Sequence, residues 1–223
     1  MTSRSFIEEN MLIDPVMQQE IIRRAVGGHF GDNPNQAVYS LGTVRTPDGR
    51  EVPVHLRHAS DAVVLDGFGH VVLVIRKHNP GAGLKALPGG FMDPVQVSGG
   101  AAIAEDAATA ALREATEETG ISRRLLEGAR ILPVGHRSYN RPFDIRVAWN
   151  DIPDTDIKKG DFFTVSTQAF SVKTTQDLSR VSLNAGDDAK GVLVATISSL
   201  TSNEFGVADH LAMIQAAQFT APV

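Results

Sequence analysis

Residues 99–121 read GGAAIAEDAATAALREATEETGI, and the end of this stretch brings one arginine and three glutamates together. Its alanine-rich composition and the glycine at position 120 predict a helix that stops at that glycine. On a helix, Glu114 lies three and four residues before Glu117 and Glu118, so the three carboxylates share one face within about 6 Å of their neighbours. We therefore expect a compact acidic cluster on one side of this helix.

Three like charges at this spacing repel one another, and a bound divalent cation removes that cost. A ligand set made of oxygen atoms alone suits Mg²⁺ or Mn²⁺ better than zinc. Arg113 can bind the Glu117 carboxylate one turn further along the helix, or it can reach back to Glu105. A bare run of charges is usually a solvated helix face, but here glycines, an arginine and glutamates coincide in one pattern.

This pattern resembles the Nudix box, the signature of a family of hydrolases. The matching positions are, in order, Gly99, Glu105, Arg113, Glu114, Ala115, Glu117, Glu118, Gly120 and Ile121. The resemblance implies a magnesium-dependent hydrolase that cleaves a nucleoside diphosphate linked to another moiety. It also implies an α+β fold, the Nudix α/β/α sandwich with a mixed central sheet.

The resemblance also assigns roles within the box. The expected metal ligands are Glu114, Glu117 and Glu118, and the residues expected to orient them are Glu105 and Arg113. The general base stays open between Glu114 and an acid from a distant loop, Asp187 or Asp188. An aspartate pair in a glycine-containing loop can equally well cap a turn.

Two glycines compete for the start of the box. The segment LPGGF, residues 87–91, resembles the turn before the box helix in Nudix proteins, particularly those that act on ADP-ribose, and there the second glycine begins the box and offers its carbonyl to the metal. That residue is Gly90, but fourteen residues separate it from Glu105, whereas Gly99 has the expected five. Either residues 95–104 contain an insertion or the helix entry starts at Gly99. The specificity of LPGGF favours an insertion of about nine residues.

Composition fits a globular protein of one large domain, or of one domain with an appendage, because 42% of the 223 residues are hydrophobic. The absence of cysteine excludes disulfides, thiolate catalysis and cysteine-bound zinc. A membrane-spanning helix needs about 18 consecutive apolar residues, and no apolar run is that long. Acidic residues lie near the N-terminus, at positions where a signal peptide would have its apolar core. We therefore expect a cytoplasmic protein that is not bound to a membrane.

The net charge of −5 argues against nucleic acid as a partner, because nucleic-acid-binding domains usually carry a basic patch. A small phosphorylated molecule remains compatible, since a metal and a few local arginines can hold it. The expected partner is therefore a small nucleotide substrate.

Two consecutive hairpins are predicted before the box, at residues 37–44 with 51–56 and at residues 62–65 with 71–75. Asp14 and Pro15 predict a short helix ahead of them. This N-terminal helix and the first hairpin form the expected unit 1–57, and residues 58–223 form the expected Nudix domain. Similar pyrophosphatases often dimerise through an N-terminal sheet, so the resemblance implies a homodimer.

Four strands are predicted after the box, at residues 130–134, 145–149, 164–172 and 191–200. The polar segment GHRSYNRPFD, residues 135–144, is expected to be a loop, and strand 145–149 is the candidate partner of strand 164–172. A last helix is expected to start near Ser202 or Asn203 and to bury residues at helical spacing, namely Val207, Leu211, Ile214 and Ala217.

Three segments outside the box resemble Nudix domains that hydrolyse ADP-ribose: TQAF at 167–170, GDDA at 186–189, and Asp209-His210. Two positions depart from that group, because Gln168 stands where histidine is more common and Lys85 where an aromatic is usual. The resemblance implies hydrolysis of ADP-ribose to AMP and ribose 5-phosphate. The alternatives are another substrate (NADH, a dinucleoside polyphosphate or a nucleotide sugar) and a non-catalytic ADP-ribose sensor.

The candidates for substrate binding lie outside the box. For the phosphates they are Arg76, Arg141 and Arg146, and for stacking on an adenine they are Tyr139 and Phe143. His210 and Asp209 are expected to serve packing and a local hydrogen bond rather than metal binding.

Overall fold

The computed structural model describes residues 38–45, 49–78, 81–96, 102–127, 129–144, 162–186, 189–207 and 209–219. The helix predicted after Pro15 and the strand predicted at 145–149 lie outside these residues.

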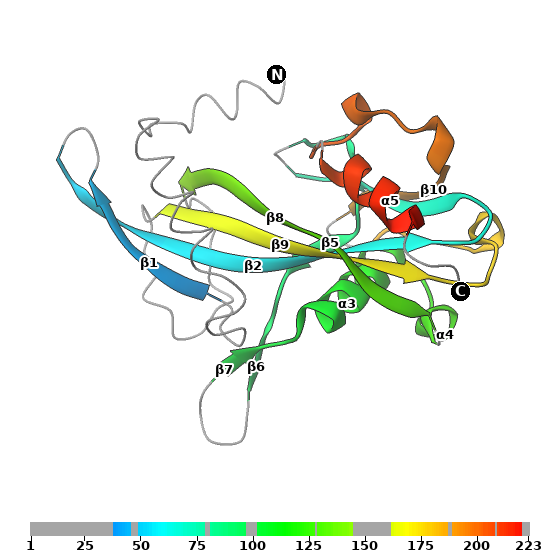
Figure 1. Cartoon of the computed structure of the whole chain (residues 1–223), viewed down its shortest axis with the longest axis horizontal. Coiled ribbons are helices and arrows are strands. Elements are labelled where there is room, and N and C mark those ends of the chain that lie inside the picture. The colour runs from blue at the N-terminus through cyan, green and yellow to red at the C-terminus, as the bar shows by residue number, and fades with distance from the viewer. Residues whose placement is uncertain are drawn as a thin grey trace.

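A mixed sheet forms the centre of the molecule, with the path β10-β3-β2-β9-β8 (Figure 1). Its strands are β1 (Val38–Arg45), β2 (Glu51–Leu65), β3 (His70–Arg76), β4 (Lys85–Ala86), β5 (Gly89–Phe91), β8 (Arg130–Asp144), β9 (Phe162–Lys173) and β10 (Ala189–Thr196). Strands β2 and β9 run parallel, and the other pairs are antiparallel. The mixed sheet implied by the Nudix resemblance is thus confirmed.

Helices α3 (Ala107–Thr119) and α5 (Asp209–Phe219) cover opposite faces of this sheet. The alternation of side chains along β2 explains the two cores. Ala62 and Val64 pack with α3, whereas Val63 and Leu65 pack with α5. This arrangement is the expected α/β/α sandwich, and Figure 1 shows α3 below the sheet and α5 above it.

The two caps of α3 bear out the predicted helix. At its start the Asp106 side chain accepts the N–H of Thr109 at 3.0 Å. At its end Gly120 adopts φ 64°, and its N–H donates to the carbonyl of Thr116. The predicted stop at Gly120 is therefore confirmed.

A separate hairpin fills the chain between β5 and α3. Its strands β6 (Pro94–Gln96) and β7 (Ala102–Ala104) pair antiparallel and project from the body of the molecule (Figure 1). Two hydrogen bonds close its base, because Glu105 N–H donates to the Asp93 carbonyl at 2.9 Å and Asp93 N–H donates to Glu105 Oε1 at 3.0 Å. The described residues 94–96 and 102–104 thus form a small sheet of their own, apart from the central sheet.

Both predicted hairpins are confirmed, because β1 pairs antiparallel with residues 51–57 of β2, and β2 pairs antiparallel with β3 across the turn that begins at Asp66. Two other predictions about the strands are wrong. The segments 51–56 and 62–65 are not separate strands but belong to one uninterrupted strand, β2, which runs through residue 57. Residues 135–144, expected to be a loop, belong to β8 and pair with β9, with register shifts after Pro133 and Tyr139. Pairing along β9 supplies backbone hydrogen bonds whatever the side chains are, so it overrides the local turn propensity.

The predicted start of the last helix is also wrong. Ser202–Glu204 form only a 3-10 turn, closed by a capping box between Thr201 and Glu204. Gly206 then donates its N–H to the carbonyl of Lys85 at 3.0 Å, which draws the chain to β4, so α5 begins only at Asp209. Ile214 and Ala217 are buried as expected, together with His210 and Met213. In the same region β10 ends at Thr196 and a 3-10 turn follows, η2 (Ile197–Ser199).

The short elements that remain are α4 (Arg123–Leu126), η1 (Leu178–Arg180) and η3 (Ser202–Glu204). Within the described ranges, no helix combines the length and the apolar character needed to cross a membrane.

Candidate active site

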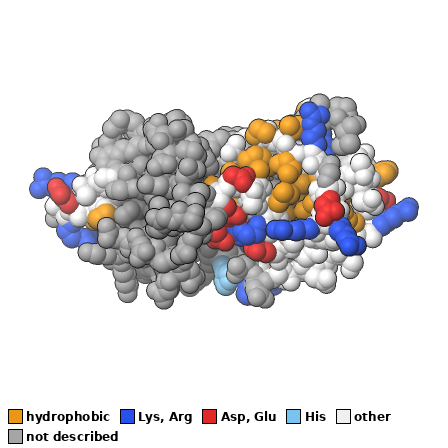
Figure 2. Space-filling view, turned by 90° about the horizontal axis from the view of Figure 1, so that it is seen from below, with side chains coloured by type: hydrophobic (Ala, Val, Ile, Leu, Met, Phe, Trp, Pro, Cys, Tyr) orange, Lys and Arg blue, Asp and Glu red, His pale blue; other side chains and the backbone are white. Residues whose placement is uncertain are grey.

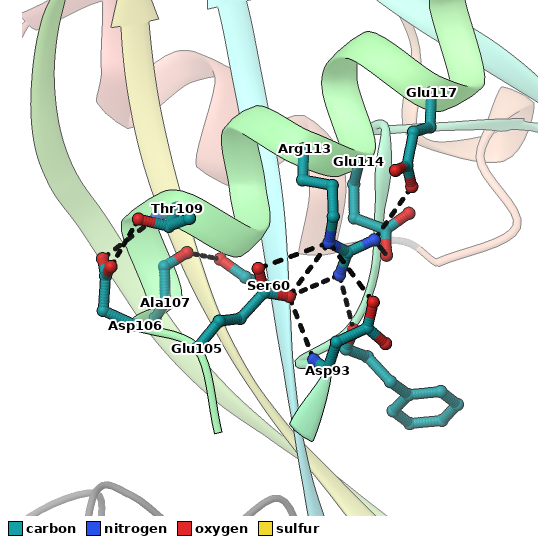
Figure 3. A network of polar contacts seen from close by, with 10 residues as sticks. Ser60, Asp93, Glu105, Asp106, Ala107, Thr109, Arg113, Glu114 and Glu117 are labelled. Atoms are coloured by element: carbon teal, nitrogen blue, oxygen red, sulfur yellow. Dashed lines mark hydrogen bonds and ion pairs between the residues drawn. The ribbon is translucent and has the colours of Figure 1, made fainter. Parts of the chain in front are cut away.

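The guanidinium of Arg113 lies at the centre of the acidic cluster (Figure 3). Its Nη1 donates to Glu114 Oε1 at 2.8 Å and to Glu117 Oε2 at 2.9 Å. Its Nε donates to Glu105 Oε1 at 3.0 Å, and its Nη2 donates to the carbonyl of Phe91 at 3.0 Å. Both contacts considered for Arg113, to Glu117 and to Glu105, are therefore present in one conformation.

These contacts hold Arg113 in place and keep it charged. Burial lowers the pKa of its guanidinium, but the hydrogen bond to Glu105 and the charges of Glu114 and Glu117 outweigh that effect and raise the pKa above its ordinary value. Charge-assisted bonds of this kind are stronger than neutral ones. On the face that carries α3, acidic and basic side chains lie directly side by side (Figure 2).

Strand β5 brings a second element against the same carboxylates. The backbone of Gly90 lies so close to Glu114 that a Cβ atom on residue 90 would stand 2.4 Å from Glu114 Oε1. The N–H of Gly89 donates to Glu118 Oε2 at 3.0 Å. Only a residue without a side chain allows this approach, so the double glycine of LPGGF borders the acidic cluster. Gly99 lies outside the described residues.

The environment of Glu114 fits a divalent cation. Burial raises the pKa of its carboxyl to about 6; Arg113 opposes the rise, and the nearby charges of Glu117 and Asp93 add to it. Burial and nearby negative charges destabilise the ionised form of this carboxylate. A divalent cation that binds its oxygens would remove this destabilisation. Sequence reasoning missed Asp93, although an acid so close to the LPGGF turn was a usable signal.

The raised pKa of Glu114 predicts how apo stability depends on pH. The folded-state pKa of about 6 exceeds the ordinary value of 4.5, so the folded protein binds more protons between these limits and becomes less stable as pH rises through them. In EDTA, the free energy of unfolding measured with urea should be lower at pH 7 than at pH 5. Glu114→Gln should remove about 1 kcal/mol of this drop, because part of the full effect of the pKa shift already lies below pH 5. An equal drop in both proteins would contradict this assignment.

The GDDA segment reaches the end of α3. Asn184 N–H donates to the Thr119 carbonyl, and Gly186 N–H donates to the Glu118 carbonyl, both at 2.9 Å. A Cβ atom on residue 186 would lie 2.0 Å from the carbonyl oxygen of Glu117. The loop therefore docks on the helix just before Asp187 and Asp188, which themselves lie outside the described residues.

The described candidates for substrate binding lie on strands β3 and β8, outside the box helix. The aliphatic stem of Arg76 packs beside Gly206. Burial raises the pKa of Asp61 to about 6, and the hydrogen bond from Thr167 and the charge of Arg76 oppose this rise. Burial lowers the pKa of His210, and the charge of Arg76 adds to that effect. Tyr139, Arg141 and Phe143 all lie on β8, and Arg146 falls outside the described residues. The structure thus brings the box residues and Gly90 together, but it does not test the predicted substrate contacts.

His210 has the structural role expected of it. Its Nδ1 accepts the N–H of Leu87 at 3.0 Å, and its ring packs edge-on against Phe205. Burial lowers the pKa of the imidazole to about 3, so the ring is neutral. Because Nδ1 accepts the N–H of Leu87, the single ring proton is assigned to Nε2. His210 therefore supports the LPGGF segment from the α5 side.

A second group of potential ligands, Asp66, His70 and Asp177, lies elsewhere in the fold. The carboxylate of Asp66 is already saturated, because Oδ1 accepts the N–H groups of Phe68 and His70, and Oδ2 accepts His70 Nδ1 and the N–H of Leu178. A cation would have to displace these bonds. The cluster is therefore explained by the turn that it closes.

Asp66→Ala should cost about 3 kcal/mol of stability, because it leaves the buried N–H of Leu178 without its acceptor and opens the turn before His70. Chemical denaturation measures this loss. Mn²⁺ affinity and catalytic rate should stay at the wild-type values at temperatures where the variant is folded. Loss of metal binding would show that this cluster, rather than the glutamates of α3, holds the cation.

With this geometry in place, the class of protein follows. A family model described as NUDIX domain matches residues 55–167, just over half of the chain, and the chain belongs to this family. Nudix enzymes generally use divalent metals, and membership supports a pyrophosphohydrolase in general. No curated protein matches the sequence.

Particular solved structures resemble the chain at low identity. The NUDIX domain of Shewanella oneidensis NrtR, complexed with ADP ribose, is 19% identical over 72% of this chain and 85% of that one, with a TM-score of 0.48. A bifunctional NMN adenylyltransferase/ADP ribose pyrophosphatase from Francisella tularensis, complexed with AMP and a Mn ion, is 25% identical over 71% of this chain, with a TM-score of 0.44. This chain spans only 39% of the Francisella protein. A C. elegans Ap4A hydrolase is 14% identical over 72% of this chain and 94% of that one, with a TM-score of 0.42.

Proposed function

We propose that this protein hydrolyses the pyrophosphate bond of a nucleoside diphosphate linked to another moiety, with Mg²⁺ as cofactor and Mn²⁺ as a substitute. One observation carries the proposal: the Gly89–Gly90 backbone lies against the carboxylates of Glu118 and Glu114, and Arg113 binds the carboxylate of Glu114. A solvated acidic face would not need a glycine strand pressed against it. The proposed ligands are Glu114, Glu117, Glu118 and the carbonyl of Gly90.

A pyrophosphate linkage is anionic and repels hydroxide, so its hydrolysis needs charge neutralisation and an oriented water. When bound, the cation would supply that neutralisation and acidify a water molecule. Glu105 and Arg113 keep the ligand carboxylates oriented through the bonds described above. The proposed general base is either Glu114 or an acid of the GDDA segment, Asp187 or Asp188.

The proposed substrate is ADP-ribose, and the resemblance of LPGGF, TQAF and GDDA to Nudix domains that act on it supports this choice. Arg76, Arg141 and Arg146 are the proposed phosphate contacts. Binding of the same molecule without turnover would define a sensor instead, and the intact glutamate trio favours catalysis.

A substrate panel tests the proposal. The full chain is incubated with Mg²⁺ and ADP-ribose, NADH, a dinucleoside polyphosphate or a nucleotide sugar, and the products are identified by mass. ADP-ribose should show the highest kcat/KM and yield AMP and ribose 5-phosphate. If another compound is preferred, the substrate choice fails but the hydrolase stands; if none is hydrolysed, the enzymatic proposal fails.

A further inference from the structure

Asp61 is a buried acid that the proposed chemistry does not use. It lies on β2, where Val63 and Leu65 pack with α5 while Ala62 and Val64 pack with α3. The alternation of the strand therefore places Asp61 on the α5 face, away from the glutamates of the box. The residue is only 8% exposed, so its carboxylate needs partners within the protein.

Its two oxygens lie against two different neighbouring strands. Asp61 Oδ2 accepts the hydroxyl of Thr167, on β9, at 2.7 Å. Asp61 Oδ1 lies over Gly89, on β5, so closely that a Cβ atom on residue 89 would stand 2.2 Å from it. Asp61 also pairs with Gly89 across the β2–β5 ladder. One side chain thus links three adjacent strands.

Strand β5 is consequently held between carboxylates on its two faces. Asp61 presses on Gly89 from the α5 side, while Glu114 meets Gly90 from the α3 side. The N–H of the same Gly89 donates to Glu118. Because β5 has only three residues, a shift of this short strand changes its distance to Glu114 and Glu118 together.

We propose that Asp61, held by Thr167, is a positioning residue that sets the place of β5 and thereby presents the Gly89–Gly90 backbone to Glu118 and Glu114. This inference rests on the proposed function, since it takes those glutamates to hold the cation. Asp61 itself touches neither glutamate; it acts through the double glycine.

The test measures Mn²⁺ affinity of the full-length chain by electron paramagnetic resonance, together with kcat and KM. Asp61→Ala and Thr167→Val should each weaken Mn²⁺ binding by about 10-fold and lower kcat, because residues that orient metal ligands typically contribute that much. KM for the nucleotide should change by less than about 2-fold. Asp61→Asn and Thr167→Ser keep the shape and the hydrogen bond, so they should restore most of the affinity.

Val63→Ala is the matched control. Val63 is fully buried on the same strand and the same face as Asp61, but it packs in the α5 core. It should lose stability and keep the wild-type Mn²⁺ affinity. Thr167→Val carries the test if Asp61→Ala does not fold.

The outcomes separate the two proposals. Wild-type Mn²⁺ affinity in both Asp61→Ala and Thr167→Val, or an equal loss in Val63→Ala, would overturn the positioning role while the proposed function stands. Failure of the wild-type protein to bind Mn²⁺ would instead overturn the proposed function, and the positioning role with it.

Discussion

Glu118→Gln is expected to lower kcat by roughly 10³-fold while the protein stays folded. Glutamine keeps the size of the side chain and an oxygen that can accept the N–H of Gly89, which Glu118 binds at 3.0 Å. It removes the negative charge that a divalent cation requires. The contact with Gly89 should therefore be kept, whereas metal-dependent hydrolysis should be lost.

The measurement is kcat at saturating Mg²⁺ and substrate, with thermal unfolding to show that the variant is folded. Glu127→Gln provides a matched control, because Glu127 is exposed at the end of α4 and lies outside the acidic cluster. That control should retain full activity. A near-normal kcat in Glu118→Gln would contradict the assignment of this residue as a metal ligand.

Gly90→Ala is expected to lose most metal binding and activity, by about 100-fold, with little loss of stability. The new methyl group would stand 2.4 Å from Glu114 Oε1 and 2.6 Å from its Cδ. These atoms form the far end of a flexible side chain, so the carboxylate can swing away at small cost to the fold. The displaced Glu114 can then no longer complete the site.

Two alanine variants serve as controls for Gly90→Ala. Gly135 on β8 has no atom within 4 Å of the position of an added Cβ, so Gly135→Ala should be silent. Gly99→Ala decides which glycine begins the box. If Gly90→Ala is fully active while Gly99→Ala is inactive, Gly90 is not the glycine that begins the box.

The parts that sequence predicted well are those set by local chemistry. Alanine content and Gly120 define where α3 ends, and helical spacing places Glu117 within reach of Arg113. The apolar run at 71–75 becomes a buried interior strand because both of its faces meet a core. These features depend on residues a few positions apart, which a sequence displays directly.

The parts that sequence missed depend on distant partners. Residues 135–144 look like a loop, yet pairing with β9 makes them a strand. The last helix starts at Asp209 because Gly206 bonds to Lys85, more than a hundred residues earlier in the chain. The role of Asp61 is not visible in the sequence, because only the pairing of β2 with β5 and β9 shows what this residue touches.

The central claim is that a divalent cation binds between α3 and the double glycine of β5. Anomalous diffraction from crystals soaked in Mn²⁺ tests it most directly. We expect an anomalous peak bounded by the carboxylates of Glu114 and Glu118 and by the carbonyl of Gly90. A peak at Asp66, His70 and Asp177 with none beside Glu114 would contradict it.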